Sequence, residues 1–154
     1  MEVKQKMKQE IGLKGNFKIA CLRDGQTVEY RDIPNTVMNA GKAEITALML
    51  TDVGGTAFDY LAVGTDSTAP NATQSALLVE KYRVAGTGSQ QTTTTTNDTA
   101  RLTTSIAITA SDSIQEAGIF NSSSAGDMLA RTTFSAISVN SGDTLNIGYD
   151  IKLS

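Results

Sequence analysis

The side-chain combinations that most enzymes use for catalysis are missing from this sequence. It contains no histidine and a single cysteine, Cys21. Histidine-dependent triads, cysteine–histidine pairs, zinc sites with several His or Cys ligands and an internal disulfide are therefore excluded. The 16 acidic residues are scattered, and no motif pairs two of them as in a glycosidase. The sequence predicts a protein that is not an enzyme and that uses no cofactor and no metal.

Two carboxylates nevertheless have mainly apolar neighbours. Glu80 lies in the segment ALLVEKYR, and Glu116 lies in the segment IQEAGIF. A buried carboxylate needs a cation or several N–H donors, because burying it alone is costly. The available cations are Arg83, Arg101 and Arg131. We predict that Glu116 is buried in a structural ion pair with Arg131 or Arg83, because no nucleophile or second acid lies nearby in the sequence.

The charge balance bears on the partners of the protein. Thirteen basic and 16 acidic residues give a formal net charge of -3, too near balance for binding nucleic acid through its phosphates. The longest strongly apolar run, residues 47–50, is far shorter than the ~20 residues of a membrane-spanning helix. Residues 1–15 lack the apolar stretch of a secretory signal. We expect no specific nucleic-acid partner, no membrane partner and synthesis in the cytoplasm.

The elements that must position these residues are mostly strands. The chain has 21 threonines, 13 serines and 13 glycines, a composition that favours pleated strands joined by turns. Two β-like runs, residues 17–22 and 27–33, flank the pair Asp24-Gly25 and predict a β-hairpin. Residues 92–96 are five consecutive threonines, which we place on an exposed strand or at the tip of a long hairpin.

Helical spacing is clearest after Pro34. Residues 35–52 are expected to form one helix that covers the core, and Gly54 offers its C-terminal stop. Residues 74–81 are expected to form a second, short helix before a strand. The apolar stripe of the first helix comprises Val37, Gly41, Ile45 and Leu48.

The many short strands indicate a mainly β fold. We predict an antiparallel β-sandwich or jelly roll with one docked α-helix and an N-terminal arm. Residues 1–15 are assigned to the arm and residues 16–154 to a single domain. The predicted core comprises Ile45, Leu48, Leu61, Val63, Ile106, Ile108, Ile119, Phe134, Leu145 and Ile147.

The arm differs chemically from the rest of the chain. Residues 1–34 carry seven basic and five acidic residues, whereas residues 35–154 carry six and eleven. The spacing of its apolar residues fits a short amphipathic helix. The segment is either a solvated terminus or an arm that orders against another subunit. The residues expected to anchor an assembly arm are Val3, Lys4, Met7, Lys8, Ile11 and Leu13.

Several segments carry a family resemblance. They are residues 35–41 (NTVMNAG) with the helix that follows, 58–65 (FDYLAVGT), 76–80 (ALLVE), 116–120 (EAGIF) and 129–134 (LARTTF). In this order the segments resemble a widespread group of small structural proteins of tailed bacteriophages, over residues 35–153. Members of that group are tail-fibre, collar, baseplate or other virion proteins. The resemblance implies a β-rich virion component with no catalytic residues.

These observations lead to one main expectation and two competitors. The chain is expected to be a noncatalytic virion structural protein, made in the host cytoplasm, that assembles with other virion proteins and with copies of itself. It would serve as a capsid-decoration, collar or tail-attachment component. A host-receptor or glycan-binding tail module would need exposed aromatics or a carboxylate-lined groove, which the sequence does not display. A glycan depolymerase would need paired acids on adjacent strands.

Overall fold

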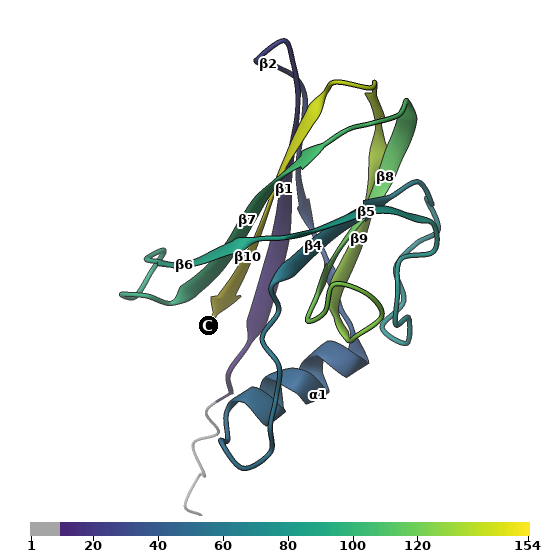
Figure 1. The fold of residues 1–154 in the computed structure, drawn as a ribbon. Helices are drawn as coiled ribbons and strands as arrows, with labels where there is room; N and C mark the ends of the chain where they lie inside the picture. Colours follow the sequence, from purple (N-terminus) through teal and green to yellow (C-terminus); the bar gives the residue numbers. More distant parts are fainter. Residues whose placement is uncertain (1–9) are drawn as a thin grey trace, which may run out of the picture.

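The computed structural model describes residues 10–154, which form two antiparallel sheets packed as a sandwich (Figure 1). Both sheets have five strands, and the predicted mainly β sandwich with one helix, α1 (Asn39–Leu48), is confirmed. Sheet A has the order β2-β1-β10-β7-β6, with β1 at Leu13–Arg23, β2 at Gln26–Pro34, β6 at Thr87–Gln91, β7 at Thr99–Ala107 and β10 at Thr144–Leu153. Sheet B has the order β3-β9-β8-β4-β5, with β3 at Thr36–Val37, β4 at Tyr60–Gly64, β5 at Glu80–Ala85, β8 at Asp112–Phe120 and β9 at Met128–Val139.

The predicted hairpin is formed by β1 and β2. Arg23 pairs with Gln26, so only Asp24 and Gly25 lie in the turn. Their φ angles are 52° and 77°, which is the left-handed conformation that a two-residue type I′ turn requires at both positions. The Asp-Gly pair therefore closes the hairpin as the sequence predicted, and a bulge at Val28 shifts the register between β1 and β2 beyond the turn.

The chain crosses from sheet B to sheet A between β5 and β6 through a single residue, Gly86. Its N–H donates to the carbonyl of Asp59 at 2.7 Å. A Cβ atom at this position would lie 2.8 Å from Cγ of Leu102. Glycine thus lets the crossing strand pass directly over the core.

The main core lies between the sheets and follows the alternation of the strands. On β1, Phe17, Ile19 and Cys21 are fully buried, whereas the residues between them point outward. Two of the predicted core residues, Ile45 and Phe134, are partly buried against this core. The predicted residues that are fully enclosed in it are Leu61, Val63, Ile106, Ile108, Ile119, Leu145 and Ile147.

A second, smaller cluster lies on the opposite, outer face of sheet B. On β8, Ala117 and Ile119 face the main core, so Gly118 and Phe120 face outward. The loop of residues 65–79 covers this face and places the side chain of Leu77 on it. We call this group the outer cluster; it consists of Met38, Ala62, Leu77, Phe120 and Met128.

The helix is shorter than the sequence predicted. Thr36 and Val37 instead pair with β9 as β3, because β-branched residues fit an extended edge strand. The helix lies across one end of the sandwich (Figure 1), so Ile45 reaches the core. The assignment of Leu48 to the core was wrong, since this residue is 44% exposed near the end of the helix. Within the described residues, no helix is long and apolar enough to span a membrane.

The predicted helix at residues 74–81 is also wrong. Residues 74–79 form bends and irregular structure, and β5 begins at Glu80. Leu78 and Val79 donate their backbone N–H groups to the carboxylate of Glu116 instead of to helical carbonyls. A distant side chain thus competes successfully with local helix formation.

Replacing Gly41 with alanine is expected to destabilise the domain, although alanine is the better helix former. A Cβ on residue 41 would lie 2.5 Å from Cα and 2.7 Å from the carbonyl oxygen of Leu129, both in the backbone of β9. Overpacking costs about 1–3 kcal/mol, which exceeds the gain of about 1 kcal/mol in helix propensity. Urea unfolding followed by circular dichroism measures the difference.

Thr46→Ala, at an exposed position of the same helix, is the matched control. This variant gains helix propensity without meeting the sheet, so its urea midpoint should stay the same or rise. A midpoint for Gly41→Ala above that of the parent would contradict the close contact between α1 and β9.

Candidate functional site

Glu116 on β8 and Arg131 on β9 form the buried ion pair that the sequence predicted. Nε and Nη2 of Arg131 donate to Oε2 of Glu116 at 3.0 and 2.8 Å. Both side chains are completely excluded from solvent. Because Glu116 shares a face with Gly118 and Phe120, the pair lies on the outer face of sheet B, beneath the loop of residues 65–79.

The pair uses its remaining hydrogen-bonding capacity on that loop. The N–H of Leu78 donates to Oε2 of Glu116 at 3.1 Å, and the N–H of Val79 donates to Oε1 at 2.8 Å. From the other side, Nη1 of Arg131 donates to the carbonyl of Thr68 at 2.9 Å and to Oε1 of Gln74 at 3.1 Å. We call Glu116, Arg131 and these loop groups the loop clamp.

The local geometry of β4 makes room for the clamp. A Cβ on Gly64 would lie 2.2 Å from the carbonyl oxygen of Val79 and 2.5 Å from Oε1 of Glu116. The register of β4 against β5 shifts between Val63 and Gly64, which marks a bulge at this point. Glu116 therefore sits in a fully occupied, closely packed position that leaves no space for a substrate.

Arg83, the other proposed partner of Glu116, pairs with Glu80 instead. Nε and Nη2 of Arg83 donate to the Glu80 carboxylate at 2.9 and 2.6 Å, on the same strand β5. Nη1 donates to the carbonyls of Ser122 and Ala125 at 3.0 and 2.9 Å, and the guanidinium carbon lies 3.6 Å from the ring centre of Phe120. This arginine thus holds the turn between β8 and β9.

Sequence reasoning missed a third charged site, where β1 meets the turn before β10. Arg23 donates from Nε and Nη2 to the two carboxylate oxygens of Asp143 at 3.0 and 2.8 Å. The N–H of Asn140 also donates to Asp143 at 2.8 Å, and the thiol of Cys21 lies 3.7 Å away. Burial raises the pKa of the Cys21 thiol, and the neighbouring Asp143 carboxylate adds to the shift. The turn sequence NSGD was the available signal for this site.

The Arg23–Asp143 contact predicts a specific loss of stability in acid. Hydrogen bonds from Arg23, then from Asn140, lower the pKa of Asp143 from 3.8 to about 2. A carboxyl group whose pKa is lowered on folding stabilises the folded state at pH values above its ordinary pKa. This stabilisation is lost as the pH falls through the lowered pKa of the folded state. The stability of the parent relative to Asp143→Asn should therefore decline between about pH 4 and pH 2.

Urea titrations of both proteins at several pH values measure this difference. Glu29→Gln removes one carboxylate from a more exposed ion pair and serves as the control. A parent and an Asp143→Asn variant that lose stability in parallel over this window would contradict the assignment.

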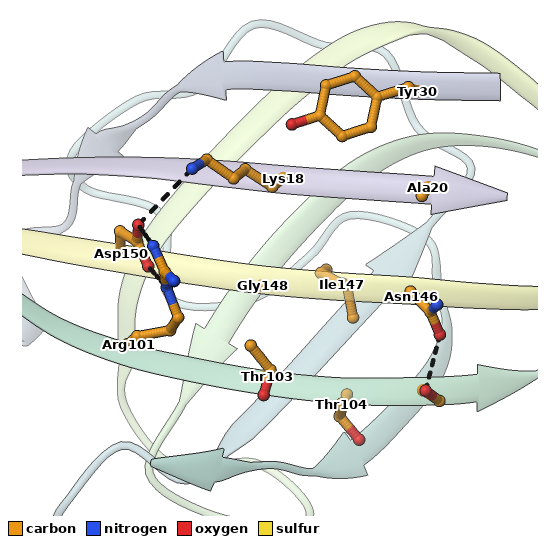
Figure 2. A pocket seen from close by; sticks show the side chains of 11 residues that line it. Lys18, Ala20, Tyr30, Arg101, Thr103, Thr104, Asn146, Ile147, Gly148 and Asp150 are labelled. Atoms are coloured by element: carbon orange, nitrogen blue, oxygen red, sulfur yellow. Dashed lines mark hydrogen bonds and ion pairs between the residues drawn. The ribbon is translucent and has the colours of Figure 1, made fainter. Parts of the chain in front are cut away.

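The outer face of sheet A carries a shallow groove of about 460 Å³. Figure 2 shows its floor along β1 and β10, where Ala20 and Gly148 are small, with the ring of Tyr30 on one side. At one end, Asp150 accepts two hydrogen bonds of 2.6 Å from Arg101 and lies 3.9 Å from Nζ of Lys18. Hydroxyl and amide groups of β7 and β10 line the other side.

The proposed arm lies largely outside the described residues. Four of its anchors, Val3, Lys4, Met7 and Lys8, fall among residues 1–9, which the structure does not describe. Ile11 is exposed, but Leu13 belongs to β1 and pairs with Leu153. The end of the arm therefore has to move from residue 15 to residue 11, because Gly12 exchanges two backbone hydrogen bonds with Ser154 and residues 13–15 belong to β1.

Over residues 10–154, no three cysteine or acidic side chains converge to form a metal site. At the start of β8, Asp112 lies 3.4 Å from Nζ of Lys81 and forms an ion pair with it.

Comparison of the chain with protein-family models, with curated proteins and with solved structures gave no significant match.

Proposed function

We propose that this chain is a noncatalytic structural component of a tailed-bacteriophage virion. It would be made in the host cytoplasm and assemble in multiple copies as a capsid-decoration, collar or tail-attachment component. The resemblance of residues 35–41, 58–65 and 116–120 to virion proteins supports this assignment. Its partners would be other virion proteins and copies of itself.

The observation that carries the proposal is an apolar surface at the end of α1. Met49, Leu50 and Val53 are 72%, 62% and 59% exposed within five residues of chain. Clustered exposed apolar side chains on a soluble domain mark contacts with other proteins more often than isolated ones do. We call Met49, Leu50 and Val53 the helix-end patch and assign it to contacts within the particle.

The ion pairs of sheet B fit the same role. Hydrogen bonds of the loop clamp and of the Arg83–Glu80 pair hold loops of sheet B in place. An ion pair in this arrangement rigidifies a surface and offers no reactive group to a substrate. A particle component needs a surface of fixed shape, so that neighbouring subunits can pack on it.

Immunogold electron microscopy of purified particles tests the proposal directly, and should place an antibody against this chain on head, neck or tail. Complementation with Leu50→Asp should greatly reduce incorporation, because a carboxylate would be desolvated in the contact. Thr51→Asp, exposed in the same turn, is the control and should incorporate normally. Particles without label would contradict the virion role. Normal incorporation of Leu50→Asp would contradict the assignment of the helix-end patch to contacts within the particle.

A second candidate function, glycan binding by a tail module, is favoured by the groove in Figure 2. Tyr30 is 53% exposed beside a row of hydroxyl groups, and an aromatic face beside polar groups suits a sugar ring. Binding of host-surface polysaccharide to the purified chain, lost in Tyr30→Ala and kept in Val28→Ala, would support this alternative. Equal binding by both variants would exclude the groove.

A further inference from the structure

An apolar groove opens between the two sheets beneath β6. It consists of two adjoining cavities of about 400 and 240 Å³, which share Gln90, Ala100, Leu129 and Ile151. Phe58, from the segment before β4, forms part of the opposite wall. The inner residue of β6 at this point is Gly88, and no atom lies within 4 Å of the position its Cβ would take. The groove is therefore open directly under an edge strand. We call it the β6 groove.

The free edge of β6 carries none of the usual protection against strand addition. Natural edge strands carry charged residues, prolines or bulges that prevent pairing with another chain. The edge strand β5 has Lys81 and Arg83, and β2 has Glu29 and Arg31 next to a bulge at Val28. The sequence of β6, TGSQQ, contains no charge and no proline. Among the described edge strands of five or more residues, β6 is thus the one open to a further strand.

The N-terminal sequence has the pattern of such a strand. All charged residues up to residue 14 occupy even positions: Glu2, Lys4, Lys6, Lys8, Glu10 and Lys14. The odd positions hold only apolar residues and glutamines: Met1, Val3, Gln5, Met7, Gln9, Ile11 and Leu13. This is the period of two that a strand requires, in phase with the core-facing residues of β1.

The same alternation argues against the amphipathic helix that the apolar spacing also allowed. In a helix, residues two apart point to opposite sides, so Lys6 would point away from Lys4 and Lys8 and the lysines would occupy both sides of the helix. In a strand, the three lysines share one face and leave the other face apolar.

Within one chain, the N-terminal segment begins at one end of the β6 groove, where Leu13 lines the smaller cavity, but it has few residues left for pairing with β6. Two strands, β10 and β7, separate β1 from β6, so a strand added outside β6 would lie about 19 Å from β1. Eleven extended residues reach at most about 40 Å, so after this lateral step and a reversal of direction only a few would remain to pair along β6 of the same chain. A second copy can lay the whole segment along the edge.

We propose that residues 1–11 of one copy pair as a strand with β6 of a second copy and place Val3 and Met7 in the β6 groove. Main-chain hydrogen bonds to β6 would provide affinity, and the alternate side chains entering the groove would provide specificity. The face that carries Lys4, Lys6 and Lys8 would stay in solvent, and β6 beside it has no charge that would repel it. The excess of acidic residues in 35–154 would attract this basic segment and so favour the encounter of two copies. This inference rests on the proposed function, because it explains how copies join.

Cysteine cross-linking between full-length chains tests the pairing. Val3→Cys, Met7→Cys and Ile11→Cys chains are mixed in turn with a Gly88→Cys chain and oxidised. At least one mixture should give a covalent dimer that contains one chain of each kind. The matched mixture with Thr87→Cys, on the opposite face of β6, should not. The parent chain controls for the native Cys21, which is buried.

A blocking variant gives a second, independent measurement. Gly88→Phe fills open space, so circular dichroism should stay unchanged while self-association, measured by light scattering, is lost. Thr87→Phe, which is exposed and does not line the groove, should associate like the parent.

The outcomes separate this inference from the proposed function. If no mixed dimer forms, or if Gly88→Phe associates normally, the strand pairing is wrong, even where antibody labels the chain on particles. If mixed dimers form but particles carry no label, the strand pairing stands and the virion assignment fails.

Discussion

Glu116→Ala is expected to lower the free energy of unfolding by about 3–5 kcal/mol, as for other buried ion pairs from which one partner is removed. The variant leaves the Arg131 guanidinium fully buried without its carboxylate. Asp66, at 3.5 Å from Nη2, is partly exposed and compensates only weakly. The N–H groups of Leu78 and Val79 also lose their acceptor, which adds a desolvation penalty. Urea unfolding followed by circular dichroism measures the loss.

The double variant Glu116→Leu/Arg131→Met tests the cause of this effect. Because it removes both charges together, it should lose much less stability than Glu116→Ala. Glu29→Ala removes one member of a more exposed pair and should change stability by at most about 1 kcal/mol. Parental stability of Glu116→Ala would refute the loop clamp as a stabilising element.

Leu61→Ala is expected to cost about 2–5 kcal/mol, because it removes a fully buried side chain and leaves a cavity. Leu61 lies on β4, between β5 and β8 in sheet B, and pairs with Val84 on β5 and Ile119 on β8. Close neighbours on both sides limit how far the surrounding structure can relax into the space. The urea midpoint should therefore fall while the slope of the transition stays the same.

Val28→Ala is the matched control for the core truncation. It also removes an aliphatic side chain from a strand, but from one that is 46% exposed on β2. Its effect should stay within about 0.5 kcal/mol. If both variants had the same midpoint as the parent, the main core would be assigned to the wrong face of sheet B.

The loop clamp also predicts the order in which parts of the domain open. Leu77 reaches this cluster from the covering loop, and the loop clamp holds that loop from beneath. Loss of the clamp should therefore release the loop before the sandwich itself unfolds. Amide exchange of the N–H groups of Leu78 and Val79 in Glu116→Ala would show this order of events.

The amino-acid sequence by itself determined the features that depend on neighbours along the chain. Alternating apolar residues specify which face of each strand is buried, and Asp24-Gly25 specifies the hairpin, because both signals act over a few residues. The apolar surroundings of Glu116 were enough to predict its burial and its need for arginine, because an unpaired buried charge is too costly to persist.

Only the tertiary structure decided which distant groups meet. Arg131 rather than Arg83 pairs with Glu116 because β9 lies beside β8 in sheet B, and no local pattern reveals that order. The same long-range contacts kept residues 74–79 out of a helix: the Glu116 carboxylate takes up N–H groups that a helix would otherwise use. Hydrogen bonds between residues far apart in sequence arise only after the strands have packed, so they can override local propensities that a sequence displays.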